Sequence, residues 1–347
     1  MSWRELIPQQ VNAGHWVTAY TLNALRERDP ESVVLPIVSL GTPADSLKAL
    51  GELVLPPLYH EALDEELKRS IVKRIKTCFP VYDEDNFDRV RVVELPRNTP
   101  GVESGGNLLA FSVDTAVEEH GPHLPLGTDT IQSYAVLEKL SREFDALEIG
   151  VPVDYGQLTW GLPFGFSIDL TAELLTNYVS RFAAAMFQWK QPRAVYVVDV
   201  HGSAIHRQAI VDGLAISGID HWSFRWLHEP LAEFASQRGD QHAGGVETCL
   251  VEHVNQDLID RQWWPNRIEP LSEGQLTFQA AVDLSHDLPK FIEHVRRHQL
   301  NGIVGDIKNY HRLDPNVLFG RMLDVARRDV EALLLGRANQ VPGADLW

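Results

Sequence analysis

Residues 171–201, TAELLTNYVSRFAAAMFQWKQPRAVYVVDVH, decide the fold class of this chain. The first half carries an apolar side chain at every fourth position, at Leu174, Tyr178, Phe182 and Met186. This spacing is typical of one face of an amphipathic helix. The second half contains the uninterrupted apolar run Ala194–Val198, the pattern of a strand covered on both faces. A helix followed directly by a buried strand is the unit from which parallel α/β sheets are built.

The same alternation extends along the chain in both directions. Leu108–Val113 is a second candidate buried strand, and Asp129 offers the cap of a helix that runs to about Phe144. Further helices are expected over residues 245–258 and 316–335. We therefore predict an α/β fold with three layers, α/β/α, in which helices cover both faces of a mainly parallel sheet.

The chain is long enough for a main domain and an additional segment, because 347 residues exceed the usual size of one domain. Residues 105–347 are predicted to form the main domain, and residues 1–104 an N-terminal extension of unknown role. The elements expected in the extension are a helix from about Gln9 to Arg26, a strand at Val33–Val38 and a helix from Ala62 to Lys76. Residues 79–107, which are rich in Pro, Asp and Gly, are interpreted as a connector.

The composition limits the kinds of binding partner and the cellular compartment that we expect for this chain. Hydrophobic residues make up 44% and charged residues 23% of the chain, and no apolar run of about 18 residues occurs, so we expect no membrane partner. The formal net charge of -17 argues against nucleic acid, because it repels phosphate backbones. The chain has two cysteines, Cys78 and Cys249, and its N-terminus does not resemble a secretion signal. Both features favour a reducing cytoplasm.

The loop after the Leu108–Val113 strand concentrates groups that bind metals. Residues 118–129 read EEHGPHLPLGTD, with carboxylates and imidazoles separated by glycines and prolines. Glu118 and His120 are two residues apart, so in an extended segment their side chains point the same way. Asp129 can return to the same point after the stiff loop. Carboxylate oxygens and imidazole nitrogens together suit Zn²⁺, Mn²⁺ or Fe²⁺.

Two further segments lie where the same site would form. His201 follows the buried strand Ala194–Val198, and ligands gather at the carboxyl ends of parallel strands. The third segment, residues 240–248, reads DQHAGGVET and leads into a predicted helix. Glu247 would lie in the first turn of that helix, where the helix dipole favours a carboxylate.

Together the three segments resemble the creatininase family. That family carries a Glu-x-His-Gly-Pro-His-Leu-Pro-x-x-x-Asp motif, an Asn-Gly-His motif after a strand, and a His-Ala-Gly-x-x-Glu-Thr motif. Here they stand as Glu118–Asp129, Asp199–His201 and His242–Thr248, with Asp-Val replacing Asn-Gly in the second. Gly302–Asp306 resembles the family's Gly-x-x-Gly-Asp segment. The resemblance covers roughly residues 105–335 and leaves the first hundred residues unexplained.

The resemblance implies a creatininase-like α/β/α fold with two divalent metal ions per chain, zinc first, with manganese or iron as alternatives. One ion would be held by Glu118, Asp129 and His201, and the other by His120, the shared Asp129 and a further carboxylate. In creatininase this carboxylate lies two residues after the His of the second motif, where this chain has Ser203. Glu247 is our prediction for the missing ligand.

The resemblance also implies roles for residues near the expected metal ligands. His242 resembles the family's proton-transfer residue, and His123 is expected outside the ligand set, where it shapes the loop by a hydrogen bond. The residues predicted to bind substrate are Trp160, Ser203, Trp222 and Trp226. For the tryptophans, packing or a subunit contact is the alternative.

The predicted activity is metal-dependent hydrolysis of a C–N bond in a small molecule such as a cyclic amide, a lactam or a formamide. Two ions about 3.5–4 Å apart can share a bridging water and lower its pKa, so a bridging hydroxide would attack the substrate. His242 would carry the proton to the leaving nitrogen. Departures from the family pattern around Ser203 and Pro163 argue against creatinine itself.

Three alternatives stay open at the level of sequence. The chain could be a non-catalytic metal-binding or interaction protein on the same fold, a mononuclear metal enzyme such as a lyase, or a family member that cleaves a C–C bond of a cyclic ketone. The partners expected are a small-molecule substrate and further copies of the chain, because the family tends to form trimer-based hexamers.

Overall fold

The computed structural model describes residues 33–43, 46–47, 50, 54–78, 90–98, 101, 105–158, 160–164, 167–234, 240–260, 273–308, 310–337 and 341. The predicted helix from Gln9 to Arg26 lies outside these residues, as does much of the predicted connector at 79–107. The described part of that connector includes a strand, Val90–Glu94, so the prediction was wrong there.

A parallel sheet of four strands forms the centre of the main domain. Its strands are β4 (Leu108–Ser112), β5 (Leu147–Ile149), β6 (Ala194–Asp199) and β7 (Trp222–Trp226), in the order β5-β4-β6-β7. Strands β4 and β6 lie side by side and every residue in them is buried, as their apolar runs predict. Because the strands are parallel, their carboxyl ends meet at one edge of the sheet.

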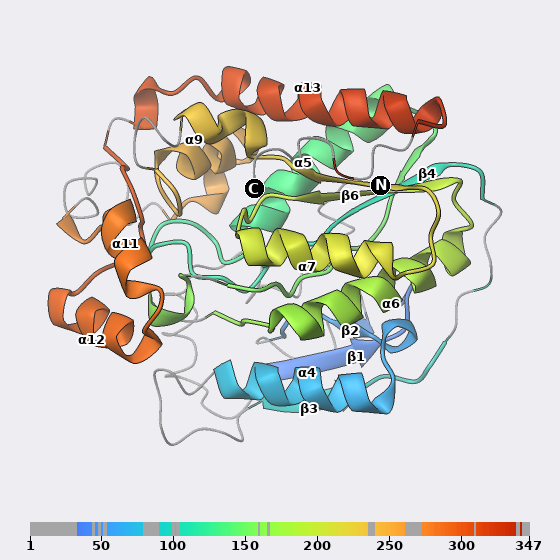
Figure 1. Ribbon diagram of the computed structural model, residues 1–347, viewed down its shortest axis with the longest axis horizontal. Coiled ribbons are helices and arrows are strands. Elements are labelled where there is room, and N and C mark those ends of the chain that lie inside the picture. Colours follow the sequence, from blue (N-terminus) through green and yellow to red (C-terminus); the bar gives the residue numbers. More distant parts are fainter. Residues whose placement is uncertain are drawn as a thin grey trace.

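Helices cover both faces of this sheet (Figure 1). One face packs against α5 (Thr128–Glu143), α9 (Gly245–Val254) and α13 (Pro315–Leu334). The other packs against α6 (Ala172–Lys190) and α7 (Ala204–Ala215). Alternate strand residues serve the two cores: Phe111 and Val197 face α6, whereas Ala110 and Tyr196 face α13. The three-layer α/β/α prediction is confirmed.

The described part of the N-terminal extension forms a second parallel sheet. Its strands are β1 (Val33–Val38), β2 (Leu58–Tyr59) and β3 (Val90–Glu94), in the order β2-β1-β3. A short 3-10 helix, η2 (His60–Ala62), leads to α4 (Glu65–Cys78), in place of the single helix expected over Ala62–Lys76. The apolar residues of β1 and α4 belong to the same core cluster as those of α6. The two sheets therefore share one continuous core across α6.

The remaining elements complete one end of the molecule. They are α11 (Phe278–Leu284), α12 (Leu288–His298) and the 3-10 helices η4 (Leu162–Phe164), η5 (Glu229–Leu231), η6 (Gln256–Leu258) and η8 (Tyr310–Arg312). Among the described residues, no helix has the length and apolar character needed to cross a membrane.

Candidate metal centre

Three segments meet at the carboxyl edge of the main sheet. Glu118 and His120 come from the loop after β4, and Asp129 lies in the first turn of α5. His201 lies two residues after Asp199, the last residue of β6, while His242 and Glu247 belong to the segment that enters α9. The side chains of all six are at most 11% exposed. The fold thus brings together every residue predicted as a ligand or proton carrier.

The two carboxylate oxygens of Asp129 face two different sets of groups. Oδ2 lies 3.4 Å from His201 Nδ1, which is itself 2.9 Å from Glu118 Oε2. Oδ1 lies 3.3 Å from His120 Nε2, which is 4.0 Å from Glu247 Oε1. These are the two groups that the family resemblance implies for two metal ions, with Asp129 shared between them and Glu247 as our predicted ligand. Their role as ligands stays a prediction.

Each histidine of the cluster has one ring nitrogen against a backbone carbonyl. The contacts are His120 Nδ1 to the Glu118 oxygen at 3.1 Å, His201 Nε2 to the Gln157 oxygen at 2.9 Å, and His242 Nε2 to the Glu119 oxygen at 2.6 Å. A carbonyl oxygen only accepts, so these nitrogens carry the hydrogen. In the neutral rings, the nitrogens that face the carboxylates then carry a lone pair. Histidines that bind metals are oriented in this way.

Two buried atoms at the centre of the cluster fit a cation. His120 Nε2 and Asp129 Oδ1 have no hydrogen-bond partner within the described part of the chain. Leaving such buried polar atoms unpaired costs free energy. A divalent ion coordinated by both would remove that cost, and the charge of Glu118 and Glu247 would be compensated as well. The set of imidazoles and carboxylates suits Zn²⁺, Mn²⁺ or Fe²⁺.

The pKa shifts of two histidines in the cluster also indicate that its carboxylates favour positive charge nearby. Burial lowers the pKa of His120, but Asp129 and, to a smaller extent, Glu247 outweigh it and raise the pKa to about 10. Burial of His201 is likewise outweighed by Glu118 and Asp129, which raise its pKa well above the usual value. Without a metal, protons on these two histidines supply the positive charge that the carboxylates require.

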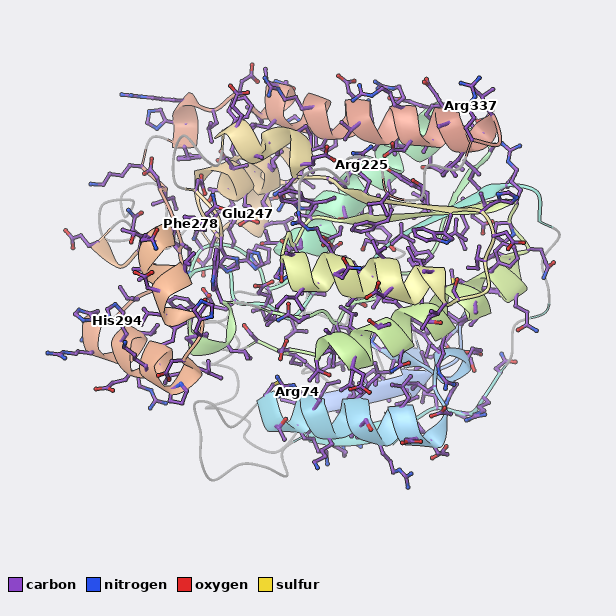
Figure 2. The ribbon with its side chains drawn as sticks, in the orientation of Figure 1. Arg74, Arg225, Glu247, Phe278, His294 and Arg337 are labelled. Atoms are coloured by element: carbon purple, nitrogen blue, oxygen red, sulfur yellow. The ribbon has the colours of Figure 1, made fainter. Side chains whose placement is uncertain are left out.

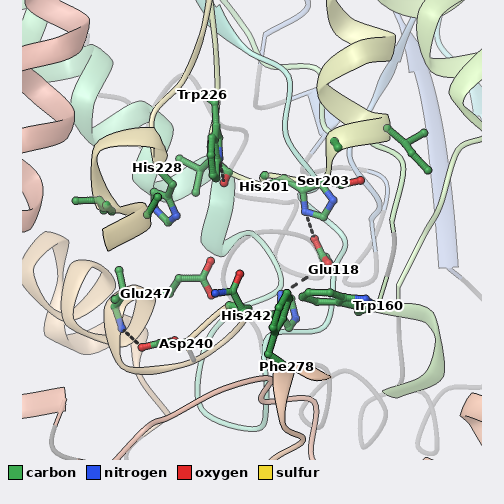
Figure 3. Close-up of a pocket in the computed structure, with 18 residues that line it drawn as sticks. Glu118, Trp160, His201, Ser203, Trp226, His228, Asp240, His242, Glu247 and Phe278 are labelled. Carbon is green, nitrogen blue, oxygen red and sulfur yellow. Dashed lines mark hydrogen bonds and ion pairs between the residues drawn. The ribbon is translucent and has the colours of Figure 1, made fainter. Parts of the chain in front are cut away.

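A cavity of about 670 Å³ opens beside the cluster. Glu118, His201 and His242 line it (Figure 3). Trp226 lies on one side, and Trp160 lies on the opposite side. Predicted pocket residues Trp160, Ser203 and Trp226 are therefore at the cavity, whose volume is within the usual range for small-molecule sites.

The prediction for Trp222 requires correction. Trp222 is 3% exposed and belongs to the apolar core. It pairs with Val195 at the amino end of β7, whereas Trp226 pairs with Asp199 at the carboxyl end, where the cavity lies. The two rings lie on the same face of the strand, and only their position along it separates a core residue from a cavity residue.

The ring of Trp226 is held by its neighbours. Its Nε1 donates a hydrogen bond to the Val200 oxygen at 3.2 Å, and the guanidinium of Arg207 lies 4.0 Å from the ring centroid. Gly202, with a positive φ of 79°, approaches the ring so closely that a Cβ would lie 3.1 Å from Trp226 Nε1. The glycine after His201 therefore allows both the left-handed turn and the close approach.

Ser203 and His123 have structural contacts in addition to their predicted roles. Ser203 caps α7, and its hydroxyl donates to Gln157 Oε1 at 2.8 Å. His123 is fully buried and its Nε2 lies 2.9 Å from the hydroxyl of Thr248, which donates to the Gly244 oxygen. Burial lowers the pKa of His123 to about 3. The neutral ring thus ties the loop after β4 to α9.

The structure adds cavity residues that the sequence analysis did not identify. His228 follows β7 and lines the cavity, with Nε2 2.9 Å from Gln132 Oε1. Burial lowers its pKa. Its place after a parallel strand was a usable signal, because the same rule identified His201. Phe278 lines the opposite wall, where its ring lies 5.8 Å from that of Trp160, and no sequence signal marks this contact.

Comparisons with curated proteins give relatives of one kind. Mycofactocin precursor peptide peptidase from Mycobacterium ulcerans (strain Agy99) is 28% identical over 153 residues, which cover 42% of this chain and 57% of the relative. The protein of the same name from Mycolicibacterium smegmatis is 26% identical over 149 residues, with coverages of 42% and 57%. The matched stretch thus spans little more than half the length of these relatives.

A crystal structure of creatinine amidohydrolase (creatininase) superposes with a TM-score of 0.49 at 15% identity, covering 65% of this chain and 90% of that one. The family model described as "Creatininase: Creatinine amidohydrolase" matches residues 110–313, which include all the cluster residues. Because this match spans more than half of the sequence, the chain belongs to the creatininase family.

Proposed function

We propose that this chain is a metal-dependent hydrolase that cleaves a C–N bond of amide type in a small substrate bound in the cavity. The observation that supports this proposal best is the arrangement around Asp129, whose two oxygens each face a separate set of nitrogen and oxygen donors. This arrangement lies at the wall of a cavity large enough for a small molecule. We propose two ions per chain, zinc first, with manganese or iron as alternatives.

The residues of the centre divide the work of such a reaction. Metal ions held by Glu118, His120, Asp129, His201 and Glu247 would supply an activated water and positive charge for the developing oxyanion. His242 lines the cavity, and its Nδ1 lies 3.9 Å from Glu118 Oε1. Because its Nε2 hydrogen is committed to the Glu119 carbonyl, Nδ1 is the nitrogen that can take up a proton and deliver it to a leaving nitrogen.

Elemental analysis of the purified protein tests the metal part of the proposal. Two equivalents of Zn, Mn or Fe per chain are expected in the wild type. Asp129→Ala should lose both, because its two oxygens serve both sets of donors. Asp145→Ala, an exposed change just after the end of the same helix, is the matched control. An Asp129→Ala protein that keeps two equivalents would show that the ligand assignment is wrong.

A second candidate substrate class is a short peptide. The curated relatives are named as peptidases, and the cavity of about 670 Å³ exceeds the size of a single lactam ring. Hydrolysis assays with the metal-loaded protein on a panel of lactams, cyclic amides and short peptides separate the two classes. Cleavage of cyclic ketones, in the same panel, would instead indicate C–C chemistry. Bound metal without turnover of any class would favour a binding protein.

We further propose that the chain acts as a homo-oligomer in the cytoplasm. Ile205 and Phe278 line the cavity yet are 55% and 41% exposed, so they provide apolar surface at its rim. The net charge of -17 disfavours a nucleic-acid partner. Light scattering after size-exclusion chromatography measures the subunit count, and a monomer would contradict the proposal.

A further inference from the structure

Gln157 forms contacts with two residues of the segment that carries His201 of the candidate metal centre. Its backbone oxygen accepts a hydrogen bond from His201 Nε2 at 2.9 Å, so it selects the ring nitrogen that faces Glu118 and Asp129. Its side-chain oxygen accepts from the hydroxyl of Ser203 at 2.8 Å. The position of Gln157 therefore contributes to the orientation of the His201 ring.

Asp169 holds the chain on both sides of Gln157. On one side, Gly156 and Asp169 form a parallel β-bridge, and the Leu170 amide donates to the Gly156 oxygen at 2.8 Å. On the other side, the Leu158 amide donates to Asp169 Oδ1 at 2.8 Å. Gln157 is thus held from both neighbours by one aspartate and the backbone beside it.

Asp169 is in turn bound by helix α4 of the N-terminal unit, residues 33–98. Arg74 Nε donates to the Asp169 backbone oxygen at 2.9 Å, and Arg74 Nη2 forms an ion pair with Asp169 Oδ2. Cys78, one turn further along α4, lies with its Sγ 3.4 Å from the same backbone oxygen. Arg74 is labelled on α4 in Figure 2, and Asp169 lies 95 residues further along the chain.

Burial makes this contact strong. Asp169 is 7% exposed, and a buried carboxylate is costly unless it is paired. Burial raises the pKa of Asp169, while the Leu158 amide and the Arg74 guanidinium act in the opposite direction. Loss of Arg74 would leave a buried carboxylate without its cation. The segment around Gln157 would then relax to bring Asp169 towards water.

We propose that the N-terminal unit braces the metal centre, with Arg74 as a positioning residue that orients His201 through Asp169 and Gln157. Arg74 lies outside residues 110–313, the part of the chain that the family model matches. The proposal rests on the proposed role of His201 as a metal ligand. It gives the extension a function within the site, distinct from any contact with substrate.

Titration of Co²⁺ into the metal-free full-length protein tests this inference. The dissociation constant is measured by competition with a chelator, and the visible spectrum of bound Co²⁺ reports the ligand geometry. Arg74→Gln should weaken binding about tenfold and alter the spectrum, as loss of residues that orient metal ligands does. Lys73→Gln makes the same charge change at an exposed position of the same helix and should leave both unchanged.

Two further comparisons separate positioning from stability. Arg74→Lys keeps the charge but lacks the planar guanidinium, whose Nε and Nη2 reach the Asp169 backbone oxygen and Oδ2 together. It should therefore show an intermediate effect, and it is the deciding variant if Arg74→Gln does not fold. A variant with a lower unfolding midpoint but wild-type Co²⁺ affinity and spectrum would overturn the inference alone. A wild-type protein that takes up no Co²⁺ would overturn the proposed function and this inference with it.

Discussion

At the scale of single residues, some buried polar atoms of the cluster lack a hydrogen-bond partner among the described residues. Asp129 Oδ1 and His120 Nε2 lie 3.3 Å apart, yet neither has a hydrogen-bond partner among the described residues. Thr115 Oγ1 lies within hydrogen-bond distance of Glu118 Oε2 and Asp129 Oδ2, at 2.5 and 2.7 Å. One oxygen of Asp129 therefore accepts a hydrogen bond from Thr115, whereas the other faces the His120 ring.

Glu247 gives the first residue-level prediction. Its Oε1 lies 4.0 Å from His120 Nε2, while its Oε2 accepts from the Ala243 amide at 2.5 Å. Glu247→Ala should reduce bound metal from two equivalents per chain to about one. Glu247→Gln keeps an acceptor for the Ala243 amide, so it separates loss of the metal ligand from loss of the turn. If both variants hold two equivalents by elemental analysis, Glu247 is not a ligand.

The second residue-level prediction concerns the pH dependence of metal binding. Against the lowering effect of burial, Asp129 and Glu247 raise the pKa of His120 to about 10, so the metal-free protein holds this proton at neutral pH. A metal ion must displace it, and the proton becomes easier to displace as pH rises. Zn²⁺ affinity should therefore increase roughly tenfold per pH unit for each displaced proton at pH values below 10. Affinity that does not change with pH would contradict a ligand role for His120.

At the scale of elements, the sheet and α13 are joined by a buried ion pair. Arg225 of β7 donates from Nε and Nη2 to the two oxygens of Asp329 in α13, at 2.7 and 2.8 Å, and is labelled below α13 in Figure 2. Tyr196 of β6 donates to the same carboxylate at 3.1 Å. Both charged residues are 7% exposed. The interaction holds the helix in register over the middle of the sheet.

Breaking this pair should be costly. Arg225→Met leaves the Asp329 carboxylate buried and without its cation, so the free energy of unfolding should fall by about 3–5 kcal/mol. The double variant Arg225→Met, Asp329→Leu should recover most of the loss. Arg142→Ala, which removes an exposed pair with Glu138, should cost about 0–1 kcal/mol. Urea unfolding measures all three, and equal losses for the buried and exposed pairs would refute this account.

At the scale of the whole molecule, the two sheets share a single core. Leu35 and Ile37 of β1 lie in the same cluster as Phe182 of α6 and Val197 of β6. Hydrogen bonds also cross between the units, from the Tyr59 amide to Tyr178 Oη at 3.2 Å and from Tyr155 Oη to the Pro56 oxygen at 2.6 Å. The apolar core thus continues across residue 104, the boundary predicted from the sequence.

A shared core predicts joint unfolding. The N-terminal sheet and the main sheet should unfold in one calorimetric transition. Unfolding of either sheet would expose apolar residues of α6 to water. Hydrogen exchange should give similar protection for the buried amides of β1 and β6. Two separate transitions, with β1 exchanging before β6, would show that the extension is an independent unit.

The local patterns of the sequence account for most of the fold and for the composition of the site. Fourfold spacing in α6 and the apolar runs of β4 and β6 predict their elements, since both patterns depend on neighbouring residues alone. Two of the three polar segments follow predictable strands, so the parallel sheet brings Glu118 and His201 to the same edge, while Glu247 lies in the first turn of the predicted helix α9. The sequence alone also shows that these segments combine carboxylates with imidazoles.

Only the tertiary structure decided how these pieces are oriented and what surrounds them. Trp222 and Trp226 look alike in sequence, and the register of β7 against β6 places one in the core and the other at the cavity. Phe278 reaches Trp160, and Arg74 reaches Asp169, across about a hundred residues of chain. Periodicity and residue type report interactions within a few positions, whereas such contacts depend on the packing of whole elements. For that reason the residues of the candidate metal centre could be predicted from the sequence, whereas the contact of Arg74 with Asp169 could not.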